Sequence, residues 1–286
     1  MSGVAPSTPP ELLGSRRSRL LGRLRPSGLL IAAASTILVF GTIGYVIVTS
    51  PGWPRVQQSF FSGEQFLNSL PIIAVALWKN IQLFLLAEVF ILALALALAV
   101  MRSLPGPAFF PFRLTAVAYI DLFRGVPSIL VIFLLGFGIP GLRVPGLTTD
   151  PFVWGLLALV LVWSAYVAEV YRAGIEAIHP SQEAAARSLG LSRAQGLRFV
   201  VLPQAVRRVI PPLLNDFIGL QKDTALVSFI GLIEVFRRTQ LEAGNFNFTP
   251  YLACGFLFLV MTIPLARLVD WLAARDRRRY LAGVAR

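Results

Sequence analysis

The sequence contains few charged residues for its length. Only 14% of its 286 residues are charged, whereas a soluble domain usually carries about 25%. Hydrophobic residues make up 56% of the chain, and the mean hydropathy is +0.72. Because this composition leaves too little polar surface to cover a water-soluble fold, it argues against a soluble enzyme and predicts a membrane protein.

Reactive side chains are also scarce. The single cysteine, Cys254, excludes an internal disulfide, and together with the single histidine, His179, it excludes a metal cluster of cysteine and histidine. Neither of the two lysines, Lys79 and Lys222, follows a glycine, whereas a phosphate-binding loop requires Gly-Lys before Ser or Thr. We therefore expect the chain to hold no metal and no cofactor, and not to bind ATP by itself.

The chain is nevertheless strongly basic. Its formal net charge is +12, which in a soluble protein would suggest a nucleic-acid partner. Here the arginines cluster beside apolar runs, as in proteins that meet the anionic cytoplasmic face of a membrane. We expect contact with lipid and none with nucleic acid.

Apolar runs long enough to cross a bilayer, about 20 residues each, fill most of the chain. Five runs are clear, and a sixth is weaker because Asp216, Lys222 and Asp223 interrupt it. The sequence therefore predicts an all-α polytopic membrane protein with about six transmembrane helices. The clear runs cover residues 29–48, 80–101, 115–138, 152–168 and 250–266, and the weaker run covers 205–236.

Arginines gather in the segments that six spans would place on one side of the membrane. By the positive-inside rule, both termini and the long connection after the fourth span then lie in the cytoplasm. We expect four parts: a flexible basic tail at 1–28, an additional helix and outer loop at 29–79, the main transmembrane domain at 80–272, and a basic end at 273–286.

The second run contains an alternation of leucine and alanine over residues 92–99 that has the period of a strand. The charge-poor sequence on both sides favours a helix instead. On a helix, Ala93 pairs with Ala97 and Ala95 with Ala99, four residues apart, which suits close packing between helices.

The cytoplasmic connection at 171–203 has the signals of two short helices separated by a turn. Pro180 suits a first helical position, and Gly190 is placed for a left-handed C-terminal cap. Ser192 and Gln195 form a capping box that opens a second helix, which we expect to stop near Pro203. From physics alone, this hairpin could simply rest on the membrane surface or could dock another protein.

The residues of this connection resemble a known motif. Residues 181–192, SQEAAARSLGLS, followed by LPQA at 202–205, resemble the EAA loop of the membrane subunits of bacterial ATP-binding-cassette (ABC) importers. Residues 210–213 (IPPL), 222–228 (KDTALVS) and 123–127 (FRGVP) resemble further motifs of the branch that imports polar amino acids. The resemblance covers about residues 80–272, and the order of several spaced motifs makes it specific.

The resemblance implies that the loop is a coupling helix that docks on a separate cytoplasmic ATPase. That partner carries the ATP and Mg²⁺, so the chain itself is not an enzyme. The coupling residues that it implies are Glu183, Ala184, Ala185, Ala186, Arg187, Gly190, Ser192 and Arg193. One departure is visible: the family pattern places its glutamate at position 184, whereas the acidic residue here is Glu183, about 100° away around a helix.

Further partners follow from the same resemblance. They are a pair of ATPase subunits, a second permease chain of the same or a different kind, and an extracytoplasmic binding protein that delivers an amino acid. The expected location is the cytoplasmic membrane. The sequence does not identify the amino acid.

Charged residues inside a span cost roughly 2.5–3.5 kcal/mol each, so they normally face partners, water or substrate. The ammonium of Lys222 could receive the carboxylate of an amino acid, and Asp223 its ammonium, with hydroxyls from Thr224 and Ser228. Gly125 could line the pathway with its backbone. Alternatively, Lys222 and Asp223 pair with other spans or lie in the outer loop. Glu169, near the end of its span, is expected to be hydrated.

Two other classes of protein remain as alternatives. A self-sufficient, ion-coupled secondary transporter could use Glu88 or Asp223 as a proton relay, but it leaves the EAA-type loop unexplained. A membrane enzyme would need a nucleophile with a nearby base or a metal site, and the sequence shows neither.

Overall fold

The computed structural model describes residues 26–244 and 246–284, and every regular element within these ranges is helical. The chain divides into two compact units, residues 1–58 and 59–286. The first unit contains α2 (Pro26–Val48) and most of α3 (Trp53–Phe60). Gly28–Val48 has the length and apolar composition of a membrane span, which agrees with the first predicted run.

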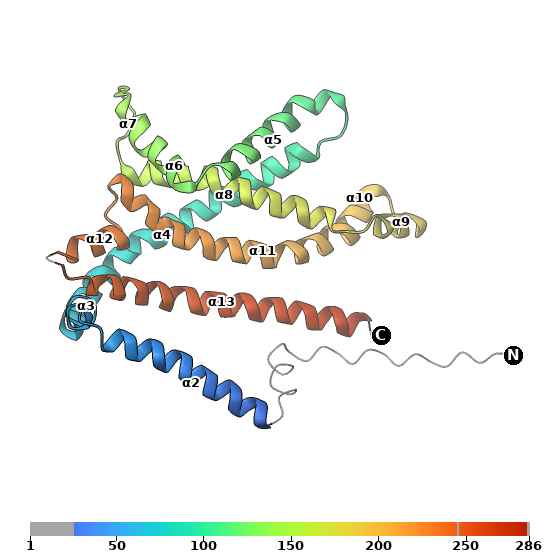
Figure 1. The fold of residues 1–286 in the computed structure, drawn as a ribbon. Helices are drawn as coiled ribbons and strands as arrows, with labels where there is room; N and C mark the ends of the chain where they lie inside the picture. The colour runs from blue at the N-terminus through green and yellow to red at the C-terminus, as the bar shows by residue number, and fades with distance from the viewer. Residues whose placement is uncertain (1–25, 245, 285–286) are drawn as a thin grey trace. The chain divides into compact units, whose positions relative to one another are not determined.

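The second unit is a bundle of long helices that begins with α4 (Gly63–Ser103) and ends with α13 (Thr249–Val284). Figure 1 shows α9 and α10 projecting at one end of the long helices and α12 at the other. The elements between α4 and α13 are η1 (Pro107–Phe109), α5 (Phe110–Gly125), α6 (Ser128–Phe133), η2 (Leu134–Gly138), α7 (Ile139–Gly141), α8 (Pro151–Glu176), α9 (Pro180–Ser188), α10 (Arg193–Gly196), η3 (Leu197–Val201), α11 (Leu202–Asp223), η4 (Thr224–Ile230) and α12 (Val235–Glu242).

The core of the second unit forms where α4 packs along α8. The alternating segment at 92–99 is helical, as predicted. Ala95 and Ala99 are buried, whereas Ala93 and Ala97 are exposed. Only one of the two predicted small-residue pairs therefore contributes to close packing between helices.

Glycines on α8 allow other segments to approach it closely. A Cβ atom at Gly155 would overlap the side chain of Val227 on η4, and a Cβ atom at Gly174 would overlap Val209 on α11. The two contacts lie near opposite ends of α8. Both α11 and η4 therefore pack closely against α8.

Four helices in the described residues are long and apolar enough to span a membrane, at Gly28–Val48, within Trp53–Ser103, at Pro151–Glu176 and at Thr249–Arg275. The helix of the second predicted run starts much earlier than residue 80, because Ser62 caps the first turn of α4 by accepting a hydrogen bond from the Gln65 amide (3.4 Å).

The third predicted run, 115–138, is not a straight span. Pro107–Gly125 and Ser128–Gly141 form a broken pair bent by 102°. Pro127 disfavours helical backbone at the residue before it, and Val126 is accordingly extended, with φ −101° and ψ 131°. Counted as one span, this pair brings the total by length and composition to five.

The weaker run, 205–236, forms two elements. The α11 helix ends at Asp223 and the tighter η4 helix follows, ending at Gly231, whose φ of +98° suits a residue without a side chain. This segment does not reach the apolar composition of a span. It nevertheless packs against α8 and α13 within the bundle.

Candidate functional site

Both ends of α9 are closed by local hydrogen bonds. At its start, the ring nitrogen Nδ1 of His179 accepts a hydrogen bond from the Ser181 amide (3.2 Å). At its end, Gly190 has a φ of +81°, its amide donates to the Arg187 carbonyl (2.9 Å), and the Leu191 amide donates to the Ala186 carbonyl (3.2 Å). This pair of bonds is a Schellman motif, and it confirms the predicted left-handed cap at Gly190.

The predicted capping box after the turn is also present. The Ser192 amide donates to Gln195 Oε1 (2.9 Å), and the Gln195 amide donates to Ser192 Oγ (3.3 Å). These reciprocal bonds begin α10. The side chain of Arg193, which the sequence also assigned to the coupling loop, lies outside the described side chains.

One face of α9 packs and the other is exposed. Ala186 is buried against Gly196 of α10, with a separation that leaves room for only a small side chain. Ala184, Ala185, Arg187 and the glycine turn are exposed. The helix thus presents a small-residue surface that another backbone could approach closely.

The displaced acidic residue lies away from this surface. Glu183 is only partly exposed and lines a cavity of about 280 Å³ together with His179 and Leu197. Ala184, at the position where the family pattern has its glutamate, lies on the exposed face. The shift by one position therefore turns the carboxylate toward the base of the loop.

The second helix of the loop does not stop near Pro203, so that prediction is wrong. The helix continues from α10 through the wide turn η3 into α11, where the Leu202 amide donates to the carbonyl of Leu197, five residues earlier. Proline has no N–H to donate, and a wider turn relieves the clash of its ring with the preceding turn. The loop is therefore joined to the bundle by one continuous helical segment.

The two charges predicted to hold an amino acid face different helices. Lys222 is exposed and lines a cavity of about 430 Å³ that Phe258 and Thr262 of α13 also line. Asp223 is half-buried and interacts with Ser128 on α6 and Trp163 on α8. The Trp163 N–H is buried and does not meet the geometry of a hydrogen bond with any acceptor. The structure therefore does not bring Lys222 and Asp223 together around one ligand.

The other predicted substrate residues differ in where they lie and in whether they are free to bind a ligand. Gly125 is exposed at the end of α5, at the bend that precedes Ser128, so it lies on the same side of the bundle as Asp223. The hydroxyl of Ser228 is buried without a hydrogen-bond partner. Thr224 is fully buried, and its hydroxyl donates to the Gln221 carbonyl (2.8 Å).

Thr224 belongs to a buried hydrogen-bond network that no pattern in the sequence indicates. Asn80 Nδ2 on α4 donates to Thr224 Oγ1 (3.1 Å) and to Glu234 Oε2 (2.7 Å). Glu234 is fully buried and also accepts from the amides of Phe236 (3.0 Å) and Arg237 (2.8 Å), so it caps α12. Thr224 therefore helps to join α4, η4 and α12.

Two more carboxyl groups meet inside the bundle. Glu88 on α4 interacts electrostatically with Asp216 on α11. Tyr171 on α8 also interacts electrostatically with Glu88.

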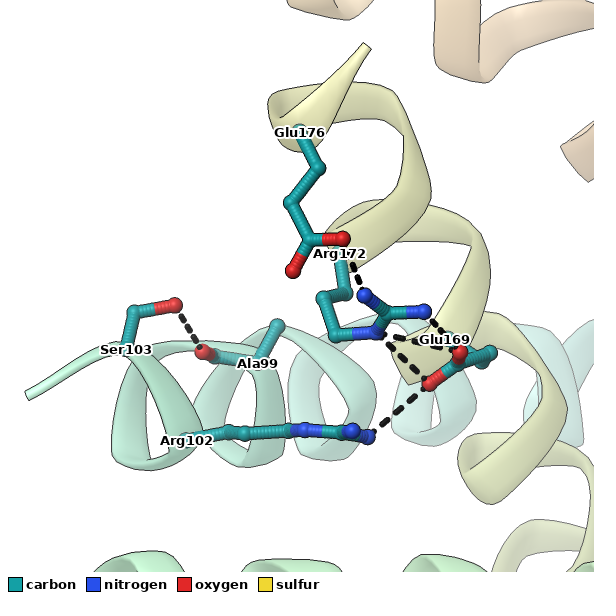
Figure 2. Close-up of polar contacts among 6 residues, drawn as sticks. All are labelled: Ala99, Arg102, Ser103, Glu169, Arg172 and Glu176. Atoms are coloured by element: carbon teal, nitrogen blue, oxygen red, sulfur yellow. Dashed lines mark hydrogen bonds and ion pairs between the residues drawn. The ribbon is translucent and has the colours of Figure 1, made fainter.

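Glu169 is not simply hydrated. Its carboxylate forms an ion pair with Arg102 of α4 (Nη1 to Oε2, 3.0 Å), and it also pairs with Arg172 one turn along α8. Arg172 in turn pairs with Glu176. Figure 2 shows these four side chains converging between the C-terminal ends of α4 and α8.

Comparison with known proteins places this architecture in a family. Residues 108–278 match the family described as the binding-protein-dependent transport system inner membrane component. The matched region is more than half of the chain. It includes the bent pair α5–α6, the α9–α10 loop and the α11–η4 segment. The chain belongs to this family of membrane-embedded transport subunits.

Curated relatives cover most of the chain. It is 35% identical over 202 residues to the probable glutamine ABC transporter permease protein GlnM of Bacillus subtilis (strain 168), covering 68% of this chain and 91% of GlnM. It is 32% identical over 223 residues to the probable amino-acid ABC transporter permease protein PatM of Vibrio harveyi, covering 77% of this chain and 99% of PatM.

Solved structures agree on the fold. A crystal structure described as an amino acid ABC transporter with histidines aligns with a TM-score of 0.67 at 32% identity, covering 73% of this chain and 96% of that chain. An inward-facing structure of the MetNI methionine ABC transporter aligns with a TM-score of 0.58 at 18% identity, covering 71% of this chain and 95% of that chain. At that identity, the second alignment supports the fold alone.

Proposed function

We propose that the chain is the permease subunit of an ATP-driven importer that moves polar amino acids across the cytoplasmic membrane. The observation that carries the proposal is the exposed small-residue face of α9, which is capped at both ends and is followed, after the glycine turn, by the continuous α10–η3–α11 segment that leads into the bundle. Such a face fits a groove on a partner, and the chain lacks a phosphate-binding loop of its own.

In this account, a pair of ATPase subunits binds ATP and Mg²⁺ and performs the hydrolysis. When the ATPases close, they displace α9. Two helical elements on either side of α9 carry the displacement into the bundle: α8, which ends at Glu176, and the α10–η3–α11 segment, which begins at Arg193. A second permease chain completes the pathway, and an extracytoplasmic binding protein delivers the substrate. The α9 end of the bundle and both termini then face the cytoplasm.

The substrate class follows from the relatives. GlnM and PatM are named as glutamine and amino-acid permeases, and the aligned crystal structure is described as containing histidines. For this chain we place the amino acid beside the α5–α6 bend, where the carboxylate of Asp223 can receive an ammonium group and Gly125 leaves the backbone accessible. Ser228 has a free buried hydroxyl in the neighbouring η4 segment.

The test is purification of the tagged chain from its host in gentle detergent, followed by mass spectrometry of the proteins that accompany it. We expect the wild-type chain to purify with an equimolar amount of a P-loop ATPase. Ala185→Asp should lose this ATPase, because it places a charge on the exposed face of α9. Val144→Asp is the matched control, because Val144 is an exposed apolar residue in the loop at the opposite end of α8.

The alternative, a self-sufficient secondary transporter, predicts a different outcome. The chain would purify without an ATPase, and Ala185→Asp would leave uptake intact. An isolated chain that transports amino acids with only a proton gradient would refute the importer proposal.

A further inference from the structure

The ion pairs around Glu169 connect three helices. Glu169 on α8 pairs with Arg102, which lies one residue before the end of α4. Arg124, in the last turn of α5, interacts electrostatically with Glu169 and lies over the ring of Tyr166 on α8, 5.8 Å from its centroid. One carboxylate therefore links α4 and α5 to the helix that leads into α9.

The ion-pair network lies close to α9. Arg172 pairs with Glu169 on one side and with Glu176 on the other, and Glu176 is the last residue of α8. Only three residues separate Glu176 from Pro180, the first residue of α9. Figure 2 shows the chain of side chains running from Arg102 across Glu169 and Arg172 to Glu176. A movement of α9 that is transmitted through α8 therefore acts directly on this network.

The network is too exposed to serve mainly as a source of stability. The side chains of Arg102, Glu169 and Arg172 are 30%, 22% and 27% exposed. Ion pairs that water reaches contribute little to the free energy of folding. They do fix geometry, because an arginine that pairs with a carboxylate on another helix restricts the distance and angle between the helices.

We propose that Glu169 is a positioning residue for transport: through its ion pair with Arg102 it makes α4 follow α8 when α9 is displaced. This inference rests on the proposed function, since it assigns a role within the coupling of ATPase to permease. Without the pair, α4 and α8 still pack through their shared core, but their ends beside α9 are no longer held together, so ATP is hydrolysed without a complete transport cycle.

The test is a double-mutant cycle in the whole transporter. The tagged chain is purified with its ATPase, reconstituted in proteoliposomes with the binding protein, and supplied with a radiolabelled mixture of amino acids and with ATP. Arg102→Gln and Glu169→Gln are each expected to lower the uptake per ATP hydrolysed by about tenfold, the size of a modest coupling free energy. The ATPase should remain bound in equal amount. The double variant should be no worse than the more affected single variant, because both remove the same contact.

Glu242→Gln is the matched control. It removes the ion pair of Arg238 and Glu242 on α12 (2.9 Å), whose side chains are similarly exposed, at the end of the bundle away from α9. Uptake per ATP should stay within about twofold of wild type, because Arg238 and Glu242 lie four residues apart on one helix and their pair holds no two helices together. An equal loss in this control would overturn the proposal.

Other outcomes of the same experiment also test the proposed role of Glu169. Unchanged uptake per ATP in Arg102→Gln, or losses that multiply in the double variant, would overturn the proposal. Loss of the ATPase from Glu169→Gln would overturn it as well, because Glu169 would then act on docking. If Glu169→Gln fails to fold, Glu169→Asp and Arg102→Lys keep both charges and should give intermediate ratios; wild-type ratios in both would overturn it. A wild-type preparation without any ATPase would refute the proposed function itself.

Discussion

At the scale of single residues, Asn80 is the polar side chain on which most of the buried network depends. Its amide reaches Thr224 and Glu234, and its carbonyl oxygen accepts a hydrogen bond from the Val235 amide (3.0 Å). Asn80 is 1% exposed and Glu234 is fully buried. A buried carboxylate that loses a donor bears a desolvation penalty that no water relieves.

Asn80→Ala should therefore lower the free energy of unfolding by about 1–3 kcal/mol, the cost of leaving buried polar groups without their partner. The measurement is the Tm of the purified protein in detergent. Gln82→Ala, two residues further along α4 at a less buried position, is the control and should leave the Tm nearly unchanged. Equal Tm values for the two variants would show that the network around Asn80 contributes nothing to the stability of the fold.

Gly190 offers a second prediction at this scale. An alanine at its φ of +81° is strained by roughly 1–2 kcal/mol, and asparagine is tolerated better in this conformation. Gly190→Ala should fray the end of α9 and accelerate trypsin cleavage in the α9–α10 loop, and Gly190→Asn should do so less. Gly141→Ala has free space and no positive φ, so its cleavage rate should match that of wild type.

The sequence predicted local features of the loop better than contacts in the bundle. The caps at Gly190 and Ser192 depend on residues within a few positions of each other, so spacing alone was sufficient. The directions of Lys222 and Asp223 depend on where α13, α6 and α8 lie, and no pattern within the segment contains that information. For the same reason, the ion pair of Glu169 with Arg102, 67 residues apart, was missed.

At the scale of elements, α8 organises the second unit. It packs against α4 on one side and receives α11 and η4 at its glycines. The α5–α6 bend and the η3 turn both arise next to a proline, where a regular helix loses a hydrogen bond or its preferred backbone. Hydropathy detects apolar length and does not by itself detect such breaks, so residues 115–138 read as one apolar run although the helix bends there by 102°.

Gly174→Leu tests the packing of α11 on α8. The added side chain would overlap Val209, and overpacking of this kind typically costs about 1–3 kcal/mol. The Tm in detergent should fall accordingly. Ala173→Leu adds similar bulk at the neighbouring exposed position and should leave the Tm close to wild type. A Tm that falls equally in both variants would mean that α11 does not rest closely on Gly174.

At the scale of the whole molecule, the proposed function makes the chain one part of a larger transporter. The chain belongs to the family of inner-membrane components of binding-protein-dependent transport systems, and its α9 face remains exposed. The composition, the helical fold and the loop could be inferred from the sequence, because apolar length and the caps are encoded locally. The packing of α11 and η4 on α8 required the three-dimensional structure.

The most direct test of the central claim is amino-acid uptake by the purified complex in proteoliposomes. We predict accumulation of label only when ATP and Mg²⁺ are supplied on the side of α9, loss of accumulation in Ala185→Asp, and retention in Val144→Asp. Uptake driven by a proton gradient without ATP, undiminished in Ala185→Asp, would contradict the account.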